Sequence, residues 1–306
     1  MIDWSLFKGY IGKFVSIRTC ISCAFRCAFC AFPQHAGKYQ VLEVEKIQKD
    51  FKALHELGCV KHIQFIDDTL NVPKERFKEM LKMMIESKYG FEWNSYIRCQ
   101  YLDEETVKLM KESGCKGVFL GIESGSQKIL DNMNKKSTIE QYRNGIALLK
   151  KYNIITFASL IIGFPGETYE TFRETVDFIK EVKPDFWRTQ LWYCDRLTPI
   201  WQEREKYDIK GASFNWSHST MNSKEAMNLI KEMYTEIKES VWLPQYNFDL
   251  NGVFHLLYRG FTLEKVKDFI RTFNKGIEFN INNNYTRENE EQVIGQIKNI
   301  LNDNMV

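Results

Sequence analysis

Residues 20–30 hold four of the eight cysteines of the chain: Cys20, Cys23, Cys27 and Cys30. Three interpretations fit this spacing. Four buried thiols would be an unusual use of cysteine in a core. A four-thiolate zinc site would use the two Cys-x-x-Cys pairs, which usually stand further apart than they do here. In the third interpretation, Cys23, Cys27 and Cys30 hold three irons of a 4Fe–4S cluster and leave the fourth iron open to another ligand.

The rest of the composition favours metal or redox chemistry over disulfide bonds. Eight cysteines in 306 residues are too few for a disulfide scaffold, and the N-terminus lacks the layout of a signal peptide. We therefore expect a cytoplasmic, reducing compartment. The chain has 42 Lys and Arg against 40 Asp and Glu, and no apolar run long enough to cross a membrane. This balance predicts neither a nucleic-acid partner nor a membrane partner.

A repeated strand-then-helix pattern positions the cysteine cluster. We expect six strands, at residues 13–19, 62–66, 91–98, 117–121, 154–162 and 186–193. Helices are expected between them, at residues 41–57, 73–87, 138–152 and 168–182, with a further helix capped by Asp103. Parallel strands need such crossover helices. The pattern predicts an α/β fold, a partial (βα)6 TIM-like barrel, with an open doubly wound sheet as the alternative.

The pattern changes after Cys194. Helical stretches follow at residues 223–241, 263–275 and 288–301 without a convincing series of strands, and residues 280–284 are expected to form a loop. We therefore predict two units. Residues 1–194 form the barrel, and residues 195–306 form a mostly helical C-terminal substrate or lid region.

The three-cysteine motif that follows the first expected strand resembles the signature of the radical S-adenosylmethionine (SAM) family. The likeness continues through residues 65–69, 120–126 and 161–167, each at the end of an expected strand. It implies a 4Fe–4S cluster held by Cys23, Cys27 and Cys30, with SAM on the open iron. In that family an electron from the cluster cleaves SAM to a 5′-deoxyadenosyl radical, which abstracts hydrogen from the substrate. The resemblance also implies a reductant such as flavodoxin or ferredoxin.

The resemblance and the strand-end positions together select candidate residues for SAM. Asp67 or Asp68 would receive the SAM ammonium group, and Glu123 would accept from the ribose hydroxyls. Gly163 would let adenine approach the backbone. In simpler interpretations the acidic residues cap helices and Arg98 is a surface charge. The full set of predicted cofactor-binding residues is Phe29, Asp67, Asp68, Arg98, Glu123, Ser124, Ile162 and Gly163.

An aromatic-rich region follows the last expected strand. Five of the seven tryptophans lie between Trp187 and Trp242. We expect residues 190–201 and 216–221 to help cover the active site, because a dry cavity protects a carbon radical from side reactions. Cys194 is a candidate catalytic residue, since a thiol can return a hydrogen atom to a substrate radical. A small buried side chain is the simpler interpretation of this cysteine.

The same aromatic region resembles the phosphinothricin-type radical SAM methyltransferases, which usually carry an N-terminal cobalamin-binding domain. The chain has no Asp-x-His-x-x-Gly cobalamin motif, so cobalamin stays open as a third cofactor. The predicted reaction is C-methylation of a small metabolite or peptide. Cobalamin-independent epimerisation, cross-linking or rearrangement is the alternative. A methylthiotransferase would need an added cysteine domain and a basic RNA-binding tail. A non-catalytic zinc or Fe–S binding protein is the alternative of another class.

Overall fold

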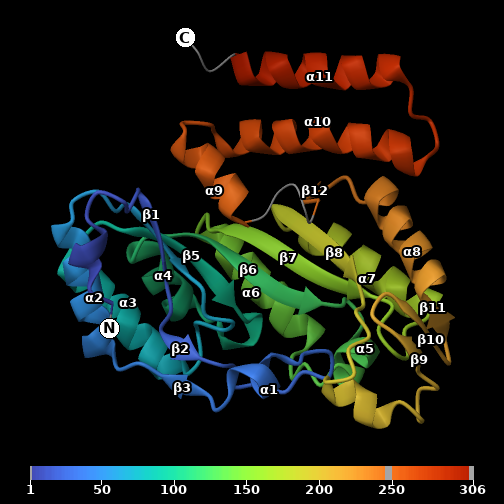
Figure 1. Ribbon diagram of the computed structural model, residues 1–306, viewed down its shortest axis with the longest axis horizontal. Coiled ribbons are helices and arrows are strands. Elements are labelled where there is room, and N and C mark those ends of the chain that lie inside the picture. Colours follow the sequence, from blue (N-terminus) through green and yellow to red (C-terminus); the bar gives the residue numbers. More distant parts are fainter. Residues whose placement is uncertain (1, 245–249, 303–306) are drawn as a thin grey trace.

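A computed structural model describes residues 2–244 and 250–302. Its centre is one sheet of seven parallel strands in the order β1-β4-β5-β6-β7-β8-β12 (Figure 1). In the described residues β1 and β12 do not pair with each other, so the sheet is a partial barrel. The strands are β1 (Phe14–Ile17), β4 (His62–Phe65), β5 (Glu92–Ile97), β6 (Cys115–Glu123), β7 (Ile155–Ile162), β8 (Phe186–Leu191) and β12 (Val241–Trp242).

The predicted α/β class and all six predicted strands are confirmed, and β12 is an addition from the C-terminal part. The crossover helices cover the outer face of the sheet with apolar side chains; Phe77, Met80 and Leu81 of α3, for example, are fully buried. The helices of this part are α1 (Phe32–Ala36), α2 (Val44–Glu56), α3 (Lys74–Ser87), α4 (Glu104–Glu112), α5 (Gln127–Asn132), α6 (Ile139–Lys151) and α7 (Tyr169–Val182). Short elements complete it: η1 (Trp4–Phe7), β2 (Cys20–Ile21), β3 (Gln40–Val41) and η2 (Cys99–Tyr101).

Side-chain caps fix where two of these helices begin. Asp103 caps α4 as predicted, and its carboxylate accepts a hydrogen bond of 2.7 Å from the Thr106 N–H. The capping box of α6 pairs Thr138 with Gln141. The sequence favours a box between Ser137 and Glu140, one residue earlier. Overlapping capping patterns of this kind leave a helix start uncertain by one residue.

The C-terminal part is more mixed than predicted. Its helices are η3 (Pro199–Glu203), α8 (Ser223–Glu236), α9 (Leu250–Tyr258), α10 (Leu263–Ile281) and α11 (Arg287–Asn302). A three-stranded antiparallel sheet also forms, from β9 (Lys210–Ala212), β10 (Asn215–His218) and β11 (Met221–Asn222). The prediction of a mostly helical part is confirmed, and the sequence did not reveal these strands because strands of two to four residues are too short to show a period. Part of the predicted loop 280–284 belongs to α10.

A second hydrophobic core lies inside the barrel. Phe119, Phe157 and Phe186 of three neighbouring strands pack there against Phe254 of α9 and Ile270 of α10. The Tyr258 hydroxyl also bonds to His62 and Glu92, the first residues of β4 and β5. Helices α9 and α10 therefore close the N-terminal ends of the strands, and α11 stacks on α10 (Figure 1). The carboxyl ends of the strands remain available for ligands.

No helix in residues 2–244 and 250–302 has the length and hydropathy needed to cross a bilayer.

Candidate active site

The three predicted cluster ligands lie in the loop between β2 and α1. None of the cysteines forms a disulfide. Burial raises the pKa of the Cys30 thiol, and the nearby thiols of Cys27 and Cys23 raise it further. Cys20 lies in β2 instead, with its sulfur 3.8 Å from the carbonyl oxygen of Ser22. Burial raises the pKa of Cys20 as well, and the Asp67 carboxylate adds to this shift.

In the described residues, no three His, Cys, Asp or Glu side chains converge closely enough to hold a single metal ion. An iron–sulfur cluster takes one thiolate per iron, so its ligands stand apart around the cluster. The assignment of Cys23, Cys27 and Cys30 as cluster ligands stays a prediction.

Asp67 anchors the start of the cysteine loop. Its Oδ1 accepts hydrogen bonds from the backbone N–H groups of Thr19 (2.8 Å) and Cys20 (2.6 Å), and its Oδ2 accepts one from the Thr19 hydroxyl. The side chain is buried, and both of its oxygens are used within the protein. Asp67 therefore positions the loop, while its neighbour Asp68 is exposed.

Arg98, at the end of β5, touches the cysteine loop directly. Its Nη2 donates to the Cys27 sulfur (3.3 Å) and to the Lys135 carbonyl (2.8 Å). The guanidinium lies 3.6 Å from the centre of the Phe25 ring. Nη1 is buried without a hydrogen-bond partner. Arg98 is thus not a surface charge. Its orphaned donor, beside the thiols, suits a ligand that brings an acceptor or a negative charge.

Glu123 ends β6 as part of a buried ion pair. Its Oε1 lies 2.8 Å from Nζ of Lys135, and both side chains are almost inaccessible to solvent. Glu123 follows a register shift in the β6–β7 pairing and has a positive φ of 65°, which is strained for a residue with a side chain. A methyl group on Gly121 would come within 2.6 Å of the Glu123 carboxylate, so this glycine makes room for the pair. Nothing in the sequence singled out Lys135.

Gly163, just after β7, is held from three sides. Its N–H donates to Glu167, and its carbonyl accepts from His218 Nε2 over 3.1 Å. Its φ is +88°, and a Cβ would come 2.5 Å from the Trp216 ring. The glycine thus accommodates a tryptophan of the C-terminal part. Burial raises the pKa of Glu167 to about 8.

Three other predicted residues face away from the cavity described below. The Ser124 hydroxyl lies 3.1 Å from that of Thr175 in α7. Ile162 is fully buried, and the alternation of β7 places Ile161 on the cavity wall in its stead. Cys194 pairs through its backbone with Ser213 and does not line this cavity. The hydrogen-donor role of Cys194 therefore stays a prediction without geometric support.

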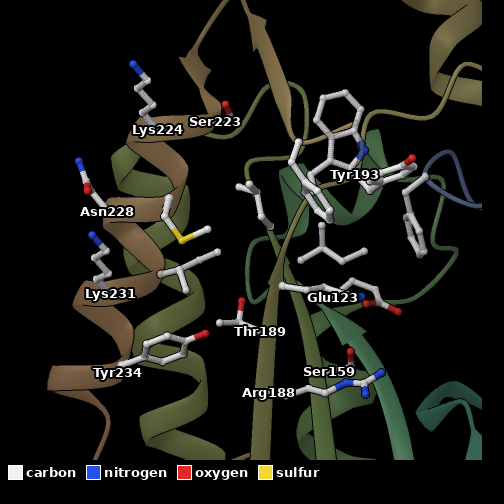
Figure 2. A pocket seen from close by; sticks show the side chains of 18 of the residues that line it. Glu123, Ser159, Arg188, Thr189, Tyr193, Ser223, Lys224, Asn228, Lys231 and Tyr234 are labelled. Atoms are coloured by element: carbon white, nitrogen blue, oxygen red, sulfur yellow. The ribbon is translucent and has the colours of Figure 1, made fainter. Parts of the chain in front are cut away.

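A cavity of about 1010 Å³ lies between the carboxyl ends of β6, β7 and β8 and helix α8 (Figure 2). This is the upper end of the usual range for ligand pockets. Two predicted residues, Phe29 and Glu123, line it. Three polar residues of the segment 190–201, which the sequence predicts to cover the active site, also line it: Gln190, Tyr193 and Asp195. The sequence did not point to the other polar residues of the wall, although an arginine inside an apolar strand was an available signal at Arg188. The missed polar residues include Ser159, Arg188, Thr189, Lys224, Asn228, Lys231 and Tyr234.

Fold and site together define an α/β enzyme with clustered thiols at the ligand end of a partial parallel barrel. Residues 17–179, just over half of the chain, match the family model of the radical SAM superfamily. The chain belongs to that superfamily and is an enzyme. The cofactors of the superfamily are a 4Fe–4S cluster and SAM.

Known proteins resemble the chain in part. It is 32% identical over 171 residues to the uncharacterized methyltransferase PH0819 of Pyrococcus horikoshii. This match covers 56% of the chain and 37% of PH0819. It is 30% identical over 255 residues to the ribosomal protein uS12 methylthiotransferase RimO of Clostridium perfringens (ATCC 13124), covering 78% of the chain and 55% of RimO. The chain thus spans about two fifths to half the length of these relatives.

The fold also resembles that of the radical SAM methyltransferase TsrM from Kitasatospora setae, solved with cobalamin and a 4Fe–4S cluster. The TM-score is 0.58 at 23% identity, over 64% of the chain and 40% of TsrM. At this identity the similarity shows the shared fold.

Proposed function

We propose that the chain holds a 4Fe–4S cluster on Cys23, Cys27 and Cys30, binds SAM beside it, and modifies a small metabolite or a peptide by a radical reaction. The observation that carries this proposal is the buried Arg98 guanidinium, bonded to Cys27 and still holding an unpartnered nitrogen. The guanidinium therefore places a positive charge and a free hydrogen-bond donor beside the loop that carries the three proposed ligands. When bound, the cluster and SAM would supply the 5′-deoxyadenosyl radical that removes hydrogen from the substrate.

The residues around the cysteine loop would position the loop and bind the parts of SAM. Asp67 holds the loop, and the exposed Asp68 carboxylate is the one available for the SAM ammonium group. Glu123, whose Oε1 lies 2.8 Å from the Lys135 ammonium, would accept from the ribose hydroxyls. The Phe29 ring, which lines the cavity, offers an apolar surface to the adenine.

The two predicted units have separate roles in the proposed function. Residues 1–194 supply the barrel and the cofactor residues. Within residues 195–306, Trp216 and His218 brace Gly163, and α8 forms a wall of the cavity. Both would limit the access of water to the reacting atoms. A small reductant such as flavodoxin or ferredoxin would deliver the electron, in a reducing compartment such as the cytoplasm.

Cysteine variants test the ligand assignment. Chains carrying Cys23→Ala, Cys27→Ala or Cys30→Ala should lose the iron and the brown absorption after anaerobic reconstitution. Cys20→Ala should keep both, because its thiol is directed at the Ser22 carbonyl. Loss of the cluster in Cys20→Ala, or its retention in Cys23→Ala, would overturn the three-ligand assignment.

For the outcome of the reaction we propose C-methylation, supported by the 32% identity to a methyltransferase. Epimerisation, cross-linking or rearrangement without cobalamin is the second candidate. Titration of the reconstituted protein with hydroxocobalamin separates them. Saturable binding, followed by transfer of the methyl group of SAM to reduced cobalamin, supports methylation. A chain that cleaves SAM but does not bind cobalamin supports the second candidate.

A further inference from the structure

One part of the cavity lies between strand β8 and helix α8. We call it the β8–α8 subpocket and define it by Thr189, Leu191, Met227, Ile230 and Tyr234, all of which line the cavity. Thr189 and Leu191 share one face of β8, because side chains alternate along a strand. The functions proposed above for the cofactor residues leave this subpocket without a role.

None of the five residues that define the subpocket is charged. The long polar side chains of α8, those of Lys224, Asn228 and Lys231, extend from the helix away from Thr189 (Figure 2). Arg188 lies on the opposite side of β8, where its guanidinium is 4.4 Å from the centre of the Phe119 ring. The subpocket therefore suits an uncharged ligand group, because a charge buried there would lack a counter-charge.

The subpocket has a buried inner end and an open outer end. Ile230 is 3% exposed and Thr189 is 4% exposed, whereas Met227, one turn before Ile230 on α8, is 40% exposed. The Tyr234 ring is held in place by stacking on Trp242, with the ring centroids 3.7 Å apart. A ligand group that enters past Met227 would therefore meet apolar surface before it reaches Thr189.

The Thr189 hydroxyl at the inner end lacks a hydrogen-bond partner. Its Oγ1 is buried and bonds to no other group of the protein. Figure 2 shows this side chain on the α8 side of its strand, with the Tyr234 ring extending toward it. Buried hydroxyls in proteins are nearly always hydrogen-bonded, so an orphan in a cavity wall indicates a group that binds there. A threonine hydroxyl both donates and accepts, so either a donor or an acceptor atom would satisfy it.

We propose that the substrate of this enzyme carries an uncharged apolar group, aromatic or aliphatic, that ends in one hydrogen-bonding atom. The apolar body of this group would lie in the subpocket between Leu191 and Ile230, and its polar atom would bond to the Thr189 hydroxyl. The subpocket would thus select the substrate. This inference rests on the proposed function, because it takes the cavity beside the cofactor residues as the substrate site.

Binding of three naphthalene probes tests the inference. Calorimetry on the reconstituted chain would compare 2-naphthol, 2-methylnaphthalene and the anion 2-naphthoate. We expect 2-naphthol to bind about threefold to tenfold more tightly than 2-methylnaphthalene, as one neutral hydrogen bond predicts. The anion should bind more weakly than 2-naphthol, because its charge would be buried without compensation. Equal binding of 2-naphthol and 2-methylnaphthalene, or tightest binding of 2-naphthoate, would overturn the inference.

Substitutions locate the effect. Thr189→Val keeps the shape of the side chain and removes the hydroxyl, so 2-naphthol should bind no more tightly than 2-methylnaphthalene. The control Thr235→Val removes a hydroxyl from the exposed side of α8, where it bonds to the Glu232 carbonyl, and should keep the preference. Met227→Trp narrows the outer end and should weaken both neutral probes. Retained preference in Thr189→Val, lost preference in Thr235→Val, or unchanged affinities in Met227→Trp would contradict the inference.

Formation of 5′-deoxyadenosine from SAM, measured on the same samples, keeps this inference separate from the proposed function. Absence of the preference for 2-naphthol with intact SAM cleavage overturns the inference alone. A clear preference that depends on Thr189, in a chain that never cleaves SAM, overturns the proposed function alone.

Discussion

The Nη2 atom of Arg98 lies 3.3 Å from the sulfur of Cys27, so a buried arginine at the end of β5 is bonded to the loop that carries the proposed cluster ligands. Its other contacts, with the Lys135 carbonyl and the Phe25 ring, fix the guanidinium in place. The barrel itself therefore places a positive charge beside the cysteine loop, and this charge is set in position before any ligand binds.

The Arg98→Met variant should keep the fold but bind the cluster more weakly than the unchanged protein. Removing a group that orients a metal ligand typically costs 10- to 100-fold in affinity, and we expect about tenfold or more here. The measurement is iron retained after a timed challenge with a chelator. The control is Arg143→Met, which removes an exposed arginine paired with Glu181. Equal iron loss in both variants would contradict the role of Arg98.

Glu123→Gln should weaken both stability and SAM binding. Because it leaves the Lys135 ammonium buried without its counter-charge, we expect a loss of about 3 kcal/mol in the free energy of unfolding. SAM affinity, measured by equilibrium dialysis, should fall about tenfold. Glu104→Gln, in an exposed pair with Lys151, should change neither quantity.

The double variant Glu123→Gln/Lys135→Met separates these two effects. It removes the orphaned charge, so stability should recover while SAM binding stays weak. Recovery of SAM affinity in the double variant would show that Glu123 acts only through the fold.

Gly163→Ala should be far more costly than an alanine at a glycine of similar backbone geometry. Gly260 has a φ of +92° with no atom within 4 Å of an added Cβ, so Gly260→Ala measures the backbone strain alone, about 1 kcal/mol. At Gly163 the methyl group would also clash with Trp216, and overpacking raises the expected cost to about 3 kcal/mol. Urea unfolding measures both, and equal losses would argue against the close Trp216 contact.

The pH dependence of stability should report Glu167. Burial raises its folded-state pKa to about 8, above its ordinary value near 4.5, so the folded protein keeps a proton that the unfolded chain releases. Stability should therefore fall as the pH rises from about 5 to about 8, by up to 1.4 kcal/mol per pH unit. Glu167→Gln keeps an acceptor for the Gly163 N–H and should flatten this slope between pH 6 and pH 8. An unchanged slope would contradict the buried, protonated carboxyl.

The sequence was most informative where a pattern of apolar residues runs over many positions. The strands β4 to β8 and their crossover helices could be predicted because each pattern runs over several residues, and the cysteine motif could be placed because it follows the first strand. The two residues of β12 carry no period at all, so their addition to the edge of the sheet depends on tertiary contacts.

The sequence suggests candidate site residues at the cysteines and strand ends, which stay predictions, and it says much less about the cavity wall. Lys135 lies in a loop twelve residues after Glu123, and only the folded chain brings the two charges together. Lys224 and Lys231 look like solvated lysines of an amphipathic helix, because the sequence does not show that α8 borders a cavity. At Gly163 the sequence predicts room for adenine beside the backbone, which stays a prediction, and the fold adds a reason for a glycine that the sequence does not show, the Trp216 ring of the same chain.

Cleavage of SAM by the reconstituted chain is the most direct test of the central claim. After anaerobic reconstitution with iron and sulfide, the account predicts a brown protein with about four irons per chain. With a strong reductant this protein should convert SAM to methionine and 5′-deoxyadenosine, detected by mass spectrometry. A colourless protein that holds a single zinc ion and forms no 5′-deoxyadenosine would contradict the account.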